Sequence, residues 1–235
     1  MKELDRFYLM KLYPFQDGIR KILSELNLPF YLTGGTALSR FYFNHRYSDD
    51  LDFFVNDDNK FDEYCKLIFD ELVNAQAEFN FVLDRKSVSK ASNFMQLFLL
   101  KDNIELKIDF VNDVAPHFGE FMFDSMSNRI DSLRNILSNK FCAIYRFEPK
   151  DIADIWIICK SFNCDFVEIL SEAKLKDAAV DPVTIYEILI SFPLDKLDLI
   201  KWVKEVDVEI FNKELKIIAD DIFNGRKNSL AEIYI

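Results

Sequence analysis

Residues 31–55, YLTGGTALSRFYFNHRYSDDLDFFV, contain the pattern from which the fold can be inferred. The first apolar run ends in Gly34-Gly35, and the second carries Asp50 and Asp52 at its start. Side chains two positions apart on a strand point to the same face, so we expect the two carboxylates to project together. Adjacent carboxylates repel each other, and a divalent cation between them makes the arrangement tolerable. Mg²⁺ prefers a few carboxylates plus substrate phosphates, so the pair indicates a magnesium site.

The glycine pair predicts a second property of the same stretch. Exposed N–H groups in a turn between a strand and a helix, together with the helix dipole, face an anion, so Gly34-Gly35 indicates a phosphate-binding turn. Each half also has a plain structural explanation. A glycine pair is often only a turn or a cap, and an acidic run is often a solvated strand start. The complete order of strand, Gly-Gly, helix, loop and Asp-x-Asp is rarer, and it favours a nucleoside triphosphate site.

The segment GGTALSRFYFNHRYSDDLDFF resembles the first motif of the DNA polymerase β-like nucleotidyltransferase superfamily, specifically its AbiEii/AbiGii toxin-type branch. The branch pattern is Gly-Gly-[Thr/Ser], a helix, and Ser-[Asp/Glu]-Asp-[Ile/Leu]-Asp-Phe, and it is matched by residues 48–53 and by Gly34, Gly35 and Thr36. The resemblance implies that the glycine turn holds the β- and γ-phosphates of a nucleoside triphosphate donor. It also implies Mg²⁺ on the two strand aspartates and transfer of a nucleoside monophosphate to an acceptor hydroxyl.

The same resemblance implies an α+β fold, with a mixed β-sheet flanked by helices followed by a C-terminal helical region. We expect a nucleotidyltransferase core over residues 1–130 and the helical region over residues 131–235. The resemblance also implies the toxin of a toxin–antitoxin pair, with an antitoxin protein as partner and RNA or tRNA as candidate acceptor. The net charge of −11 gives a nucleic-acid acceptor no independent support, so a protein hydroxyl or a small molecule stays open.

A third carboxylate is expected on the strand IELKIDFV, residues 104–111. Ile104, Leu106, Ile108 and Phe110 alternate with Glu105, Lys107 and Asp109, and the polar set should face the cleft. Nucleotidyl transfer needs a base or a second metal ligand near the acceptor hydroxyl, and Asp109 can serve as either. KIDFV also fits the family pattern for this acid. Glu105 is the competing candidate, and an ordinary exposed strand aspartate is the plain alternative.

Three further residues are candidates for nucleotide contacts. Arg46, in the loop before the aspartates, can pair with triphosphate oxygens or lie exposed to solvent. Lys140 and Asp154 resemble the later family motifs, in which a helix lysine faces the nucleotide and an aspartate organises the site. The alternative for Asp154 is a surface pair with Lys150, four residues earlier on one helix.

Composition narrows the class of protein. None of the four cysteines forms a C-x-x-C pair and only two histidines exist, which argues against a zinc site. The first residues lack a signal-peptide pattern and no apolar run approaches membrane-spanning length, so we expect a cytoplasmic protein without a membrane span. Two rival classes remain open: a nucleotide-binding regulatory module that has lost catalysis, and a purely structural interaction protein.

Apolar spacing predicts the remaining elements. We expect helices at 3–12, 15–26, 36–43, 61–73, 132–146, 151–160, 165–176, 182–191, 195–204 and 207–224. We expect strands at 79–85, 93–101 and 104–111, with a tight hairpin at Asn103 and a loop with short strands over 112–131.

Overall fold

A mixed sheet carries the Asp-x-Asp motif in the computed structural model, which describes residues 2–234. Within those residues the strands follow the order β3-β5-β6-β2-β1-β8-β7, and β4 pairs with β5. The pairs β2–β6 and β1–β8 are parallel, and the others are antiparallel. The strands are β1 (Tyr31–Thr33), β2 (Leu51–Asn56), β3 (Val82–Leu83), β4 (Ser89–Ala91), β5 (Phe94–Lys101), β6 (Ile104–Asp113), β7 (Met122–Phe123) and β8 (Arg129–Ile130).

The contacts of the backbone divide the chain into two units. The first, here called the sheet unit, comprises the residues up to Phe41 together with Tyr47–Ala115 and Phe121–Asp131. The second, the helical unit, comprises Tyr42–Arg46, Pro116–Glu120 and the residues from Ser132 onward. The helical unit therefore includes two short segments that lie, along the chain, between parts of the sheet unit.

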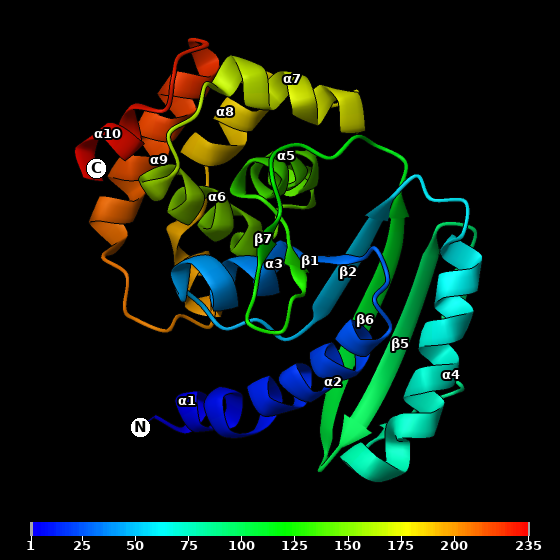
Figure 1. Ribbon diagram of the computed structural model, residues 1–235. Helices are drawn as coiled ribbons and strands as arrows, with labels where there is room; N and C mark the ends of the chain where they lie inside the picture. The colour runs from blue at the N-terminus through cyan, green and yellow to red at the C-terminus, as the bar shows by residue number, and fades with distance from the viewer. Residues whose placement is uncertain (1, 235) are drawn as a thin grey trace. The chain divides into compact units, whose positions relative to one another are not determined.

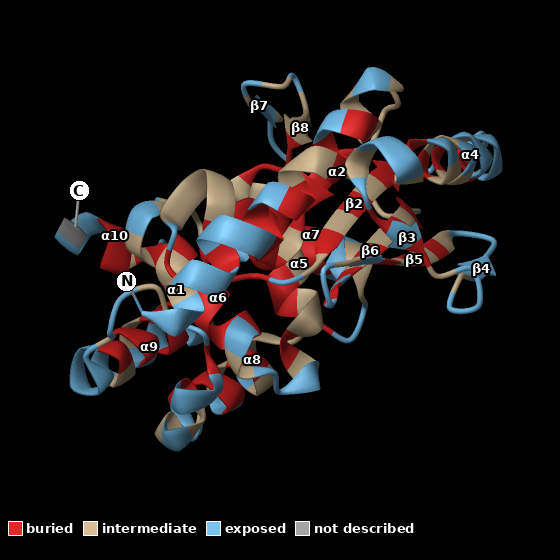
Figure 2. Cartoon of the chain, turned by 90° about the horizontal axis from the view of Figure 1, so that it is seen from below, coloured by how far each residue is buried: buried red, intermediate tan, exposed pale blue. Residues whose placement is uncertain are grey.

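Two helices of the sheet unit lie beside its longest strands. Figure 1 shows α2 and α4 beside β5 and β6. The exposed residues of α4 are pale blue in Figure 2, whereas its side chains Phe61, Ile68 and Leu72 are buried. The α-helices of the sheet unit are α1 (Glu3–Phe7), α2 (Tyr13–Glu25), α3 (Gly34–Ala37) and α4 (Phe61–Phe79), and π-helical turns follow α1 and α3 at Tyr8–Leu12 and Leu38–Phe43.

The alternation predicted for residues 104–111 is confirmed. On β6, Leu106, Ile108 and Phe110 are buried, whereas Lys107 and Asp109 are partly exposed. A strand that buries every second side chain gains hydrophobic free energy only in one register, because a shift by one residue would turn the apolar set outward. The register of β6 therefore fixes the face on which its polar residues lie.

The helical unit contains six α-helices among its described residues. They are α5 (Leu133–Ala143), α6 (Pro149–Ser161), α7 (Phe166–Lys176), α8 (Pro182–Ile190), α9 (Val208–Phe223) and α10 (Ser229–Tyr234). Side chains at the N-caps of α5, α7, α8 and α9 accept hydrogen bonds from the first-turn N–H groups, which stabilises these starts. No helix within residues 2–234 combines the length and the apolar character needed to cross a membrane.

Two of the predicted elements differ from the structure, and one helix was not predicted. The helix expected at 195–204 is only a 3₁₀ segment, Leu194–Leu199, and α10 was not predicted. The strand expected at 79–85 shrinks to Val82–Leu83 because α4 continues to Phe79 and ends at Asn80 in a left-handed conformation. The hairpin at Asn103 is confirmed, and both turn residues, Asp102 and Asn103, have positive φ, as tight hairpin turns require.

The register of β6 can be tested with two neighbouring substitutions. Leu106→Ala should lower the free energy of unfolding by about 2–5 kcal/mol, because it leaves a cavity at a fully buried position. Glu105→Ala, at the exposed position one residue earlier, should change it by less than about 0.5 kcal/mol. Urea unfolding followed by circular dichroism measures both values. Equal losses in the two variants would contradict the register.

Candidate active site

The glycine turn lies directly against one of the two motif aspartates. Gly34 begins α3 immediately after β1 and has φ of +68°, in the left-handed region that favours glycine. A Cβ atom at this position would lie 2.7 Å from Oδ2 of Asp52. The Thr36 hydroxyl donates a hydrogen bond to the backbone carbonyl of Asp50. Both the conformation and the close approach therefore require glycine at position 34, and Thr36 ties the turn to the start of β2.

The three predicted carboxylates come together in the sheet unit. Asp52 on β2 is the register partner of Asp109 on the adjacent parallel strand β6. Nζ of Lys107 lies 3.1 Å from Oδ2 of Asp50 and 3.1 Å from Oδ2 of Asp109. One ammonium group therefore connects two of the three acids. Glu105, the competing candidate, is exposed and lies two strand positions before Lys107.

Two neighbours of Asp109 were not predicted as site residues. Nε2 of Gln96 donates to Oδ1 of Asp109 at 2.8 Å, and Gln96 is its register partner on β5. A two-residue turn at 102–103 fixes that register, so pairing the two predicted strands outward from the turn would have placed Gln96 opposite Asp109. The alternation already placed Lys107 on the polar face, but it could not show that its ammonium reaches Asp50.

The charge state of Lys107 follows from these contacts. Partial burial lowers the pKa of its ammonium group, but the charges and hydrogen bonds of Asp50 and Asp109 outweigh burial and raise the pKa above its usual value. The side chain stays cationic and offsets the repulsion between the acids.

The donor set fits a hard divalent cation. Asp50, Asp52 and Asp109 offer oxygen atoms only, as Mg²⁺ prefers. Within residues 2–234 no three His, Cys, Asp or Glu side chains are already arranged as a metal site, and Lys107 bridges Asp50 and Asp109 instead. A cation at this face would take over the electrostatic role that the Lys107 ammonium group has in the protein alone.

The other three predicted residues form a buried ion cluster within the helical unit. Arg46 donates from Nε to Oδ1 of Asp154 and from Nη2 to Oδ2, both at 2.7 Å, in a bidentate pair. Nζ of Lys140 lies 2.7 Å from Oδ2 of Asp154 and 2.6 Å from Oδ1 of Asp151. Nε2 of His45 is 2.9 Å from Oδ1 of Asp154. The alternative of a surface Asp154 is wrong, because this side chain is fully buried.

The pKa values in this cluster show how the buried charges are balanced. Burial alone would raise the pKa of Asp154, but Lys140 and Arg46 hold it well below its usual range. Burial also opposes the charge on Lys140, yet its two carboxylate partners raise its pKa. Burial lowers the pKa of His45 despite its bond to Asp154. Contacts of Arg46, Lys140 or Asp154 with a nucleotide remain predictions, since in the structure these side chains bind one another.

The mixed sheet with its flanking helices is a fold that solved structures share. Two solved Helicobacter pylori structures share the fold at 21% sequence identity. One is JHP933, with a TM-score of 0.59 over 95% of this chain and 94% of that chain. The other, provisionally assigned as a nucleotidyltransferase, has a TM-score of 0.58 over 95% of this chain and 97% of that chain.

The chain belongs to the nucleotidyl transferase AbiEii toxin family of type IV toxin–antitoxin systems, whose family model matches residues 20–227. It is therefore a nucleotidyltransferase, and the resemblance seen in the first motif is confirmed over most of the chain. An uncharacterized protein of Aquifex aeolicus is 28% identical over 188 residues, which are 75% of this chain and 81% of that protein.

The role of Lys107 as a counter-ion can be tested without substrate. Lys107→Gln should lower the melting temperature in the absence of divalent cations, because the acids lose the ammonium between them. MgCl₂ should then raise the melting temperature of this variant more than that of the wild type, since the cation no longer competes with a side chain. Lys90→Gln, which removes a surface pair with Asp62, is the control. Equal shifts in all three proteins would contradict the assignment.

The buried cluster predicts a large stability effect. Asp154→Asn should cost about 3–5 kcal/mol, because it leaves Arg46 and Lys140 buried without their shared carboxylate. Asp198→Asn, at an exposed position of the same unit, should leave the free energy of unfolding nearly unchanged. Urea unfolding of the two variants measures the difference, and a stable Asp154→Asn protein would refute the energetic role of the cluster.

The same cluster should make the wild type less stable in acid. Unfolded His45 takes up a proton below about pH 6.5, whereas the folded side chain stays neutral to lower pH. Its contribution is therefore complete above pH 6.5 and falls as the pH drops through the folded pKa. The contribution of Asp154 is complete above its unfolded pKa, near 3.8, and is lost at still lower pH. His45→Gln should remove the first loss and leave the second.

Proposed function

We propose that this protein transfers a nucleoside monophosphate from a nucleoside triphosphate to an acceptor hydroxyl in a Mg²⁺-dependent reaction. The observation that carries the proposal is the side-by-side placement of Asp52 and Asp109 on adjacent strands, with Asp50 joined to Asp109 through Lys107 and with Gly34 packed against Asp52. Oxygen ligands for a cation and a turn for phosphates thus occur within one sheet unit.

The glycine turn is assigned to the triphosphate. The N–H groups of Gly34, Gly35 and Thr36 are at the start of a helix, and therefore without helical partners of their own, which suits β- and γ-phosphate oxygens. Thr36 contributes its backbone rather than its hydroxyl, because the hydroxyl is bonded to the carbonyl of Asp50.

The aspartates have two roles in the proposal. Asp50 and Asp52 hold the metal, and Asp109 either completes the metal site or accepts the proton of the attacking hydroxyl. Bound Mg²⁺ would neutralise the triphosphate and stabilise the charge that develops during transfer. The bond from Gln96 to Oδ1 orients Asp109, and Oδ2 accepts from Lys107. Oδ2 is therefore the oxygen that we assign to the metal or to the proton of the attacking hydroxyl.

The family further suggests that this chain acts as the toxin of a toxin–antitoxin pair and that an antitoxin protein exists. An RNA end, such as that of tRNA, is the acceptor that we propose. The net charge of −11 disfavours long nucleic-acid contacts, so a protein hydroxyl and a small molecule are the alternatives.

One labelling experiment separates these acceptors. Purified protein and Mg²⁺ are incubated with each α-labelled nucleoside triphosphate, once with total cellular RNA and once with cellular protein. Label in RNA supports the proposal, whereas label in protein or in a small product would replace the acceptor. Triphosphate binding without any product would favour the catalytically inactive module, and no binding would favour a structural interaction protein.

The carboxylates are tested by conservative substitutions. Asp50→Asn, Asp52→Asn and Asp109→Asn should each reduce transfer by at least about two orders of magnitude, because each removes a fixed charge from the reacting centre. Glu105→Gln, on the same strand as Asp109 but at an exposed position, should retain near-normal transfer. Initial rates are measured at saturating triphosphate, with circular dichroism to confirm folding. Normal turnover in any of the three aspartate variants would remove that residue from the site.

A further inference from the structure

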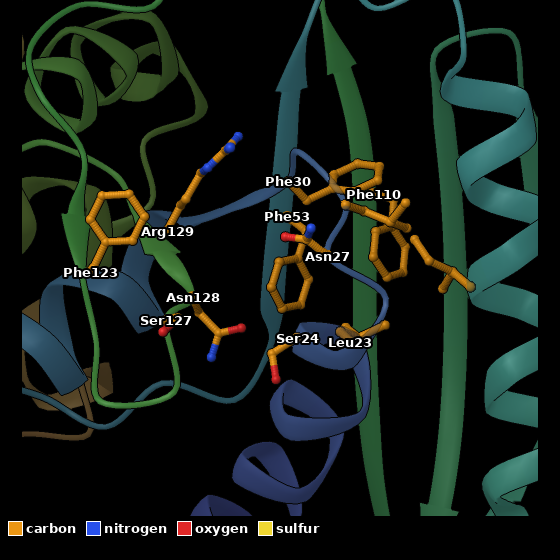
Figure 3. A pocket seen from close by; sticks show the side chains of 12 residues that line it. Leu23, Ser24, Asn27, Phe30, Phe53, Phe110, Phe123, Ser127, Asn128 and Arg129 are labelled. Carbon is orange, nitrogen blue, oxygen red and sulfur yellow. The ribbon is translucent and has the colours of Figure 1, made fainter.

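A pocket lies on the face of the sheet opposite the acids. Phe53 follows Asp52 on β2 and Phe110 follows Asp109 on β6, so the two rings point away from the carboxylates. They form part of the wall of a cavity of about 260 Å³, together with Phe30. Figure 3 shows these rings on the strand side of the cavity and the residues of the β7–β8 hairpin on the other side.

The hairpin wall is fixed in place by a buried ion pair. Arg20 of α2 pairs with Asp124 in the turn between β7 and β8, and both side chains are buried. Asp124 also accepts hydrogen bonds from the backbone N–H groups of Met126 and Asn128, at 2.9 and 2.8 Å. The guanidinium of Arg20 stacks over the ring of Phe41 at 4.6 Å. The two walls are therefore held at a set separation before any ligand arrives, which reduces the entropy cost of binding.

The apolar wall suits a flat ring. The Phe110 ring stacks on Phe53, with centroids 5.5 Å apart and planes at 13°, and meets Phe30 edge-on at 5.4 Å. Phe30 is only partly buried, so its ring presents an aromatic surface to the cavity. Aromatic rings prefer such stacked or edge-on neighbours. The cavity of about 260 Å³ is slightly smaller than the roughly 300–1,000 Å³ of most small-molecule pockets, which limits the ligand to one or two rings.

The rim carries the groups that would recognise a carboxylate. Nη1 of Arg129 donates to the carbonyl of Pro29 at 3.1 Å, which uses one of five guanidinium N–H donors. Within residues 2–234 Arg129 forms no ion pair with a carboxylate. The side chains of Asn27, Asn128 and Ser24 line the same cavity, although Nδ2 of Asn128 also donates to Asp124 and the Ser24 hydroxyl donates to the carbonyl of Lys21. An aromatic floor with one arginine and two amides at its rim matches a planar ring that bears a single negative charge.

We propose that this pocket binds a planar aromatic carboxylate of one or two rings. The ring lies among Phe30, Phe53 and Phe110, and the carboxylate pairs with Arg129. Binding at this site requires neither nucleotide nor metal. The proposal can therefore be tested separately from the proposed transfer reaction.

The test uses indole-3-carboxylate as the probe, titrated into the full-length protein and followed by ¹H–¹⁵N NMR. Saturable shifts should centre on the backbone signals of Phe30, Phe53, Phe110 and Arg129. Arg129→Gln should weaken binding by at least about tenfold, through loss of a charge-assisted hydrogen bond, and indole-3-carboxamide should bind the wild type more weakly by a similar factor. Arg85→Gln, at an exposed position in the same unit, is the matched control and should bind as the wild type does.

A second variant blocks the cavity instead of removing the charge. Ser24→Phe places a ring at the end of α2 and should abolish the shifts while the rest of the spectrum shows a folded protein. The proposal is overturned by the absence of saturable shifts up to the solubility of the probe, by shifts centred elsewhere, or by unchanged binding in Arg129→Gln or Ser24→Phe. Equal affinity for the carboxamide would overturn the assignment of an anionic ligand.

Discussion

The placement of Asp52 beside Asp109 on β2 and β6 brings two negative charges close together, and other residues of the sheet unit have to offset their repulsion. Two carboxylates on adjacent strands repel each other unless positive charge or hydrogen-bond donors lie close by. Lys107 supplies the charge and Gln96 supplies a donor. The glycine turn follows from the same requirement, because any side chain at position 34 would collide with the Asp52 carboxylate.

The helical unit also contains neighbouring carboxylates, but their charges are balanced in a different way. The acids of the sheet unit are partly exposed, whereas Asp151 and Asp154 are fully enclosed and are paired with Lys140 and Arg46. Because these side chains are buried, loss of one of them would leave an unpaired charge in the interior. Such a charge costs far more free energy than an unpaired charge at the surface. The two groups of carboxylates therefore differ in exposure and in how their charge is balanced: Asp50 and Asp109 share the partly exposed Lys107, whereas Asp151 and Asp154 are neutralised in the interior.

The sequence predicted those structural features that depend on the spacing of neighbouring residues. Alternation along β6 placed Asp109 among its polar residues, and the structure pairs Asp109 with Asp52 of β2, since strand geometry depends only on neighbouring residues. The sequence did not predict contacts between segments that are far apart in the chain. Nothing near Arg46 in the chain indicates that Asp154 will enclose its guanidinium, and nothing near Arg20 indicates Asp124. The expected helix at 195–204 failed because its apolar periodicity is short and ambiguous, and a 3₁₀ segment can satisfy it.

The membership of Tyr42–Arg46 in the helical unit has a consequence for synthesis of the chain on the ribosome. Arg46 emerges 108 residues before Asp154, its bidentate partner. Every residue of the sheet unit has been translated by Asp131, but until α6 has been translated the segment just before β2 lacks the carboxylate that pairs with Arg46. A nascent or truncated chain that ends before α6 would therefore carry Asp50 and Asp52 directly after a segment that is not yet held by its buried ion pair, so the start of β2 is fixed only once Asp154 is available.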